Sequence, residues 1–245
     1  MKNSISSDLF ISEEFKKALH TLKSGILSDS PFILLSGQSG TGKTTLLRSL
    51  SRELDKTRYQ IFYLAYGQMR PATFTRVLAS HLHLPHRVSS METGQMIIQT
   101  LKNQPYRLLL IIDEAHHFSD PLFLEIRLLA ESQLDHKPLF SVCFSGLPEL
   151  KERLLTPMLI PLWRRFSPKI LLQGLIREEV KPYLEFCFLK KTIDRLSDEA
   201  LSILFEQSKG IPGILKPMTQ DLLKHYLTER ITQKQVETWI GEWNE

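Results

Sequence analysis

The glycine-rich segment 37–44, which reads GQSGTGKT, constrains the fold of this chain more than any other feature. The continuous apolar run 31–36 comes directly before it and predicts a strand that is buried on both faces. Leucines at helical spacing follow in 43–55 and predict a helix. A strand, a loop of the form G-x-x-x-x-G-K-[ST] and a helix, in this order, are the signature of a phosphate-binding loop.

The residue types in this loop explain its chemistry. Glycines let the backbone curl so that consecutive N–H groups point at a phosphate, and the dipole of the following helix adds to the attraction. Lys43 is predicted to be catalytic by reaching the β- and γ-phosphates, and the Thr44 hydroxyl is predicted to coordinate Mg²⁺. The predicted cofactors are ATP and Mg²⁺, with nucleotide contacts from Gly37, Gln38, Ser39, Gly40, Thr41, Gly42, Lys43, Thr44 and Thr45.

A second half of the same site is predicted where Asp113 and Glu114 follow the apolar run 108–112. Asp113 is expected to hold the Mg²⁺ ion and the nucleotide, mainly through water. Glu114 is expected to be the catalytic residue that polarises the water attacking the γ-phosphorus in line. Small-molecule kinases of this class usually lack the second acid, because their substrate supplies the nucleophile. The pair therefore favours ATP hydrolysis over phosphoryl transfer to a metabolite.

Strand and helix patterns alternate through the first part of the chain. Further strands are predicted at the short apolar runs 59–66, 107–113, 139–144 and 169–172. This alternation implies a parallel sheet with helices on both faces, the α/β core of a P-loop NTPase. After Gly174 only helices are predicted, at 177–189, 197–208, 212–228 and 232–239. The sequence thus predicts an α/β nucleotide-binding domain over 1–175 and a small all-helical lid domain over 176–245.

Composition is that of an ordinary globular protein, with 42% hydrophobic and 24% charged residues. No run approaches the roughly 18 apolar residues of a membrane span, and the N-terminus lacks the apolar stretch of a signal peptide. Cys143 and Cys187 both lie in apolar runs, as expected for reduced thiols of a cytosolic protein. We therefore expect a cytoplasmic protein that does not bind membranes.

Charge is distributed unevenly along the chain, whose net charge is +4. Residues 1–175 hold 21 Lys and Arg against 15 Asp and Glu, whereas residues 176–245 hold 10 against 12. A basic first domain is compatible with contact to DNA, although an ordinary solvated surface explains the same numbers. Basic residues of this domain that qualify as contacts to a phosphate backbone are Arg70, Arg76, Arg87 and Lys102.

With both motifs in place, residues 5–230 resemble the AAA+ ATPases of the ExeA-like group. This group includes the transposition ATPases related to TniB and TnsC and, more distantly, MuB. Besides the phosphate loop, the resemblance is carried by DEAH at 113–116, FSGLPEL at 144–150, LWRRF at 162–166 and GIP at 210–212. The segment FSGLPEL is similar to the turn after the fourth strand in this group, and GIP is similar to the turn that opens a helix of the lid.

The resemblance implies an ATP-dependent regulator of DNA transposition. Such proteins bind ATP between neighbouring subunits and assemble as rings or helical filaments around double-stranded DNA. They recruit or stimulate a DDE transposase, and a TniQ-like target-selection protein is a further expected partner. Arg165 matches the catalytic arginine finger of the group, which neutralises charge on the γ-phosphate held by the next subunit. Arg164 is the less favoured bearer of this role.

The sequence departs from the pattern of the group at two positions that sense the nucleotide. The residue after Gly146, often a polar sensor of the γ-phosphate, is Leu147, and Ser145 is the candidate to substitute for it. The arginine expected after the GIP turn is replaced by Gly213, and Lys216, about one helical turn on, is the candidate to act in its place. We therefore expect slow hydrolysis that is stimulated by DNA or by a partner.

Other residues that bear reactive or aromatic side chains are expected to have structural roles. The spacing of His81, His83 and His86 fits no usual metal site. The two histidines after the acids, His116 and His117, are expected to orient their loop or to face the γ-phosphate. Three tryptophans are expected to anchor packing, Trp163, Trp239 and Trp243.

Three other functions stay open on the sequence alone. Secretion ATPases of the same group resemble this core but are anchored to a membrane. Loaders of the Orc/Cdc6 kind ordinarily append a winged-helix domain, for which the predicted lid leaves no room. An ATP-gated scaffold that barely hydrolyses ATP would fit the two altered sensor positions.

Overall fold

The computed structural model describes residues 9–65, 68–85, 89–132, 138–227 and 230–243. The chain divides into two compact units. The larger unit comprises Lys17–Gly37 and Lys43–Leu171, and the smaller unit comprises Met1–Lys16, Gln38–Gly42 and Leu172–Glu245. The domain limits 1–175 and 176–245 stay a prediction.

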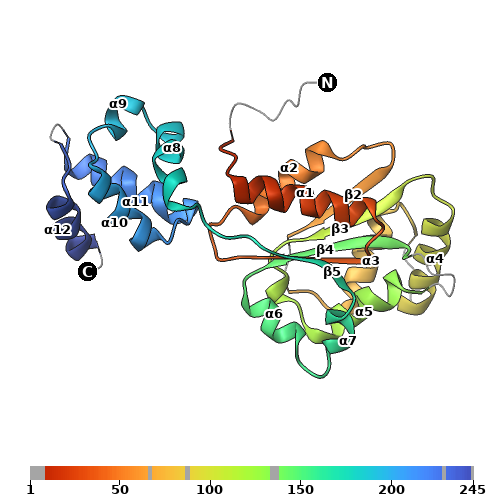
Figure 1. The fold of residues 1–245 in the computed structure, drawn as a ribbon. Coiled ribbons are helices and arrows are strands. Elements are labelled where there is room, and N and C mark those ends of the chain that lie inside the picture. Colours follow the sequence, from red (N-terminus) through yellow and green to blue (C-terminus); the bar gives the residue numbers. More distant parts are fainter. Residues whose placement is uncertain (1–8, 66–67, 86–88, 133–137, 228–229, 244–245) are drawn as a thin grey trace. The chain divides into compact units, whose positions relative to one another are not determined.

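The larger unit is built around a parallel sheet of five strands in the order β2-β3-β4-β1-β5 (Figure 1). The strands are β1 (Phe32–Ser36), β2 (Tyr59–Leu64), β3 (Arg107–Ile112), β4 (Phe140–Gly146) and β5 (Phe166–Leu171). Strands β1 and β4 are buried throughout, as their continuous apolar runs predict. Because β3, β4 and β1 are neighbours, the loops that follow these strands meet at one edge of the sheet.

Helices cover both faces of this sheet (Figure 1). Helices α1 (Glu13–Leu27) and α2 (Lys43–Glu53) lie on one face. Five helices pack on the other face, α3 (Pro71–His81), α4 (Ser90–Lys102), α5 (Asp120–Ala130), α6 (Glu149–Leu154) and α7 (Ile160–Trp163). Their apolar side chains form one core with alternate residues of the strands, such as Leu110 and Phe144. A single 3₁₀ turn, η1 (Ala115–His117), follows β3.

The C-terminal part of the chain is helical and has a core of its own. Its helices are α8 (Arg177–Cys187), α9 (Lys190–Ile193), α10 (Asp198–Ser208), α11 (Pro212–His225) and α12 (Gln233–Trp243). Leu201, Leu204 and Leu215 are buried among them. The Ser197 hydroxyl caps α10 by accepting a hydrogen bond from the Ala200 N–H at 3.2 Å.

The predicted fold, an α/β P-loop core followed by helices, is confirmed. Three helices were not predicted, α1, α7 and α9. The last strand begins at Phe166 rather than near residue 169, because its first residue already pairs with Phe32 of β1. Among the described residues, no helix is both long enough and apolar enough to cross a membrane.

Candidate active site

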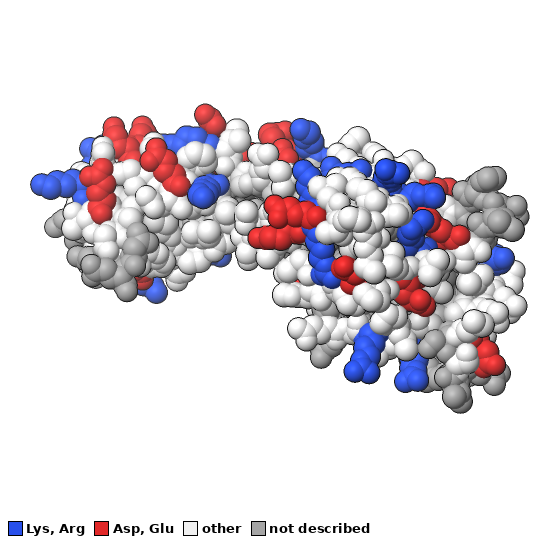
Figure 2. All heavy atoms as spheres, turned by 90° about the horizontal axis from the view of Figure 1, so that it is seen from below, with Lys and Arg blue, Asp and Glu red and all other residues white. Residues whose placement is uncertain are grey.

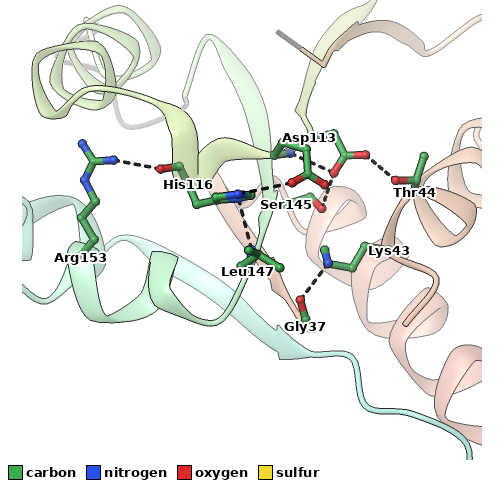
Figure 3. A network of polar contacts seen from close by, with 9 residues as sticks. Gly37, Lys43, Thr44, Asp113, His116, Ser145, Leu147 and Arg153 are labelled. Carbon is green, nitrogen blue, oxygen red and sulfur yellow. Dashed lines mark hydrogen bonds and ion pairs between the residues drawn. The ribbon is translucent and has the colours of Figure 1, made fainter. Parts of the chain in front are cut away.

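The glycine-rich loop leaves the carboxyl end of β1 and enters α2. The Gly37 N–H donates to the Gly146 carbonyl at 3.2 Å, which ties the first residue of the loop to the end of β4. Lys43 begins α2, and its ammonium donates to the Gly37 carbonyl at 2.8 Å. Burial lowers the pKa of Lys43, while the nearby carboxylates of Glu114 and Asp113 act in the opposite direction. The charge of Lys43 is therefore held against the first residue of the loop (Figure 3).

The middle of the loop, Gln38–Gly42, belongs to the smaller unit. Gly40 and Gly42 have φ values of +82° and +100°, which glycine adopts without a steric penalty. The Gly213 N–H, at the start of α11, donates to the Gly40 carbonyl at 3.0 Å. A Cβ atom added to Gly213 would lie 2.7 Å from the Cα of Gly40, so the two backbones touch. This contact gives the physical reason for glycine at the position where the resemblance predicts arginine.

The Asp113 carboxylate accepts four hydrogen bonds at the end of β3, and Figure 3 shows those from Thr44 and Ser145 among them. The hydroxyls of Thr44 and Tyr63 donate to Oδ2 at 2.7 and 3.0 Å. The Ser145 hydroxyl and the Glu114 N–H donate to Oδ1 at 2.8 and 3.1 Å. The carboxylate is thus fixed from β2, α2 and β4 together, and only 2% of Asp113 is exposed.

These contacts change the acidity of both partners. Burial alone would raise the pKa of Asp113, but the hydrogen bonds from Thr44, Ser145 and Tyr63 outweigh it, so the pKa lies below its usual value. Burial and the nearby Asp113 carboxylate raise the pKa of Tyr63 to about 12. Asp113 is therefore ionised near neutral pH, while Tyr63 keeps the proton that it donates.

The donor set at Asp113 fits a magnesium ion. A hydroxyl has one proton and two lone pairs, and the Thr44 hydroxyl donates its proton in a hydrogen bond to Asp113. Its lone pairs are therefore left to bind a cation. Mg²⁺ prefers such hard oxygen ligands and keeps several waters, for which the Asp113 carboxylate is a suitable acceptor. Thr44 and Asp113 are the residues that would hold the ion.

Glu114 has different surroundings from its neighbour. Its φ is +54°, a left-handed conformation that costs a non-glycine residue of order 1 kcal/mol and that clusters at functional sites. Its side chain is 46% exposed, and its Oε2 lies 3.5 Å from Nε2 of His116. The left-handed turn carries this carboxylate out of the sheet, beside the buried Asp113.

The structure brings together only part of the predicted site. Lys43, Thr44, Asp113 and Glu114 meet at the ends of β1 and β3. The hydroxyl of Ser145, predicted as a phosphate sensor, is fully buried and bonded to Asp113. The side chains of Gln38, Ser39 and Lys216 are exposed, whereas Thr41 is buried and donates to the Gln38 carbonyl at 2.9 Å.

Arg165 follows α7. It is distant in sequence from Lys43 and Glu114, the other predicted catalytic residues, and its contact is with another acid. Its guanidinium lies 3.3 Å from Oε1 of Glu131, and its side chain is 55% exposed. Tyr63 was not predicted as a site residue, although β2 was predicted around it. The sequence signal that would identify Tyr63 is its hydroxyl group near the carboxyl end of β2, the strand that pairs with β3.

The other histidines and tryptophans have varied contacts. The His81 ring stacks on Phe62 at 4.2 Å between centroids. Lys169 lies over the Trp163 ring at 4.3 Å. Among the described residues, Glu114, His116 and His117 place one ligand atom each within 4.8 Å of one another. His86 and Arg87, also considered from the sequence, lie outside the described residues.

Comparison with known proteins decides the family. The sequence profile of the AAA domain family matches residues 26–154, which include both motifs. The chain belongs to the AAA domain family. General secretion pathway protein A of Aeromonas hydrophila is 28% identical to this chain over 217 residues, covering 84% of this chain and 39% of that protein. The chain thus spans well under half the length of this relative.

Solved structures share the fold of this AAA domain protein. Cdc6p of Pyrobaculum aerophilum is 15% identical, with a TM-score of 0.63 over 90% of this chain and 63% of the other. The ORC1 protein of Aeropyrum pernix, solved in complex with DNA, is 14% identical with a TM-score of 0.60 over 96% and 66%. The RuvB branch migration motor of Thermotoga maritima is 22% identical with a TM-score of 0.57 over 94% and 68%. These likenesses extend the AAA+ fold to the helical C-terminal part.

Proposed function

We propose that this AAA domain protein binds ATP with Mg²⁺ and hydrolyses it. The observation that carries the proposal is the meeting of Lys43, Thr44 and the acids 113–114 at the carboxyl ends of β1 and β3. Lys43 supplies a positive charge beside the loop, and Glu114 is exposed enough to reach a water molecule. A lysine for the phosphates, a carboxylate for the metal ion and a second acid that can orient water are parts that P-loop NTPases use for phosphoryl transfer to water.

Each residue of the site has a distinct part in this proposal. The loop amides and Lys43 bind and orient the phosphates, and the Asp113 network holds Thr44 so that its lone pairs face outward. Glu114 accepts a proton from the attacking water. When bound, Mg²⁺ neutralises charge that develops between the β- and γ-phosphates.

Two variants and a control test this proposal. Lys43→Ala is expected to abolish ATP binding measured by calorimetry. Lys43 is the one charged residue of segment 37–44, and in this motif the lysine contacts the phosphates. Glu114→Gln is expected to bind ATP as the wild type does and to lose hydrolysis. Lys56→Ala, which removes an exposed lysine beyond α2, is the control and should change neither quantity. Wild-type protein that takes up no ATP with Mg²⁺ would refute the proposal.

We further propose that ATP controls assembly on double-stranded DNA and that the protein regulates DNA transposition. The support is the resemblance to transposition ATPases in segments 113–116, 144–150 and 162–166. Arg165, on the last of these, is exposed and held by one acid, so it is free to exchange Glu131 for a phosphate of another subunit. A DDE transposase and a TniQ-like protein are the proposed partners.

Surface charge gives this second proposal weaker support. Figure 2 shows Lys and Arg interspersed with Asp and Glu over the larger unit, without one continuous basic stripe on this face. Arg70 and Arg153 line a cavity of about 690 Å³ together with His117. This concave surface is the place where we expect a phosphate backbone, because two arginines line it.

Electron microscopy with duplex DNA and a non-hydrolysable ATP analogue tests the assembly. Rings or filaments that need both ligands are expected, and Arg165→Ala should prevent hydrolysis in them, whereas Arg164→Ala should not. Phosphate release should be slow and rise at least several-fold with DNA. Brisk release by the isolated monomer would contradict the stimulated mechanism. A protein that hydrolyses ATP but ignores DNA would leave only the first proposal.

Secretion is the second candidate function, favoured by the 28% identity to general secretion pathway protein A. The neighbouring genes separate the two. A transposase gene beside this one supports a role in transposition, and secretion genes beside it support a role in secretion. Binding to secretion components in place of DNA would decide for the second candidate.

A further inference from the structure

The turn that carries Glu114 is attached to the end of β4 as well as to β3. Gly146, the last residue of β4, lies so close to this turn that an added Cβ would come 3.4 Å from both N and Nδ1 of His116. The same Cβ would come 2.9 Å from Leu150. The backbone and the imidazole of His116 therefore lie in van der Waals range of this strand end.

The ring of His116 is held on both of its nitrogens. The Leu147 N–H points at Nδ1 with 3.5 Å between the nitrogens, and Nε2 faces Glu114 Oε2 at 3.5 Å (Figure 3). An Nδ1 that accepts a hydrogen bond carries no proton, so the proton of the neutral ring is on Nε2. Burial lowers the pKa of His116 and keeps the ring neutral near pH 7. Nε2 is therefore a donor, and it faces the carboxylate.

Both distances are long for hydrogen bonds, which is common at catalytic contacts before a substrate is bound. The backbone of His116 is fixed separately. Arg153 on α6 donates from Nη1 to the His116 carbonyl at 3.1 Å, and its Nε donates to Asp120 at 2.8 Å. The ring of His116 thus lies between the end of β4 and the carboxylate of Glu114, while its backbone carbonyl is bonded to helix α6.

We propose that His116 is a positioning residue that donates from Nε2 to Glu114 and aims this carboxylate at the attacking water, under the control of the β4 end. This inference rests on the proposed hydrolysis. It assigns to His116 the connection between the end of β4 and the reacting groups that a polar side chain at position 147 would otherwise provide. Leu147 takes part through its backbone N–H, which explains how a leucine is tolerated there. Movement of β4 or of Arg153 is then transmitted to Glu114.

Four variants separate the donor of His116 from its bulk. His116→Gln keeps an amide N–H near the place of Nε2, and His116→Asn keeps an acceptor near Nδ1 but does not reach Glu114. His116→Phe keeps the ring without a donor. His20→Ala is the control, because it removes an exposed histidine of α1 that has no part in the proposed site.

Loss of the donor is expected to lower kcat for ATP hydrolysis by about tenfold in His116→Asn and His116→Phe, since misplacing a catalytic group by about 1 Å has effects of this order or larger. His116→Gln should stay within about threefold of the wild type, and all variants should keep the Kd for ATP and the Tm. Equal loss in His116→Gln and His116→Phe, or unchanged kcat in His116→Phe, would overturn the proposal.

A second measurement decides the contact without hydrolysis. Nitrogen NMR of isotope-labelled histidine, with His116→Gln to assign the signal, should show the Nε2–H tautomer. This signal should move in Glu114→Ala and stay in place in Glu149→Gln, which alters an exposed acid that also raises the pKa of His116. The Nδ1–H tautomer, or no response to Glu114→Ala, would overturn the proposal. Failure of the wild type to hydrolyse ATP would instead refute the proposed function and leave this result standing.

Discussion

Asp113 and Glu114 are adjacent acids, yet their carboxylates have opposite surroundings. Asp113 is 2% exposed and accepts hydrogen bonds from three side chains and one backbone amide. Glu114 is 46% exposed at its side chain, and it faces one histidine at 3.5 Å. The change from an extended strand to a left-handed residue separates them. One acid has a fixed position, as a cation site needs, and the other can move, as an acceptor of a proton from water needs.

The largest effect is expected from Asp113→Ala. It leaves the hydroxyls of Thr44 and Ser145 without their acceptor, and leaving such buried donors unsatisfied is expected to cost about 3 kcal/mol of the free energy of unfolding. Hydrolysis should fall by about 10³-fold or more because the cation site is lost. Urea unfolding and phosphate release measure the two effects. A variant as stable as the wild type would show that the hydrogen bonds to Asp113 do not hold this part of the site in a fixed position.

Glu114→Gln should affect only one of the two quantities. Hydrolysis is expected to fall about 10²- to 10⁴-fold, the range for loss of a general base. The free energy of unfolding should change by less than about 0.5 kcal/mol, as for other partly exposed side chains. A large loss of stability here would erase the contrast with Asp113.

Ser145→Ala tests one donor of the network. We expect a loss of about 1 kcal/mol in the free energy of unfolding, together with weaker Mg²⁺-dependent binding of ATP. Ser141→Ala is its control on the same strand, because the Ser141 hydroxyl is bonded to the Ser30 carbonyl at 2.8 Å. Both variants should lose stability, but only the first should lose affinity for the metal-bound nucleotide.

The smallest effect is expected from Tyr63→Phe, because this side chain is partly exposed. The folded pKa of Tyr63 is raised to about 12, so its contribution to stability is complete below the ordinary value of 10.0. It is lost as the pH rises through about 12, where the folded protein must give up the proton. Unfolding measured between pH 9 and 11 should show a shallower fall with pH in the variant than in the wild type. Equal slopes would remove Tyr63 from the network.

The core of the site could be predicted because its residues belong to two short segments. The carboxyl ends of parallel strands lie at the same edge of a sheet, so the loop after β1 and the two acids after β3 come together there, with only β4 between the two strands. The partners of Asp113 were harder, because Tyr63 and Ser145 are 50 and 32 residues away in sequence. Their approach depends on the register of β2, β3 and β4, and the apolar runs of β3 and β4 do not alternate with polar residues in a way that would fix this register.

The elements that were missed have similar explanations. Helix α1 has Phe15, Leu19, Leu22 and Ile26 at helical spacing, so its signal was present in the sequence. Helices α7 and α9 have four residues each, too few for a periodic pattern. The contacts of His116 were beyond prediction, because they depend on the left-handed turn at Glu114 and on the position of the Leu147 N–H after β4.

The backbone contact between Gly40 and Gly213 bears on how this chain can evolve. The obstacle to any side chain at position 213 is main chain, which cannot rotate aside as a flexible side chain does. A single codon change that restores arginine there would push the loop and α11 apart before the new guanidinium met a phosphate. An arginine at position 213 thus demands a prior shift of the backbone.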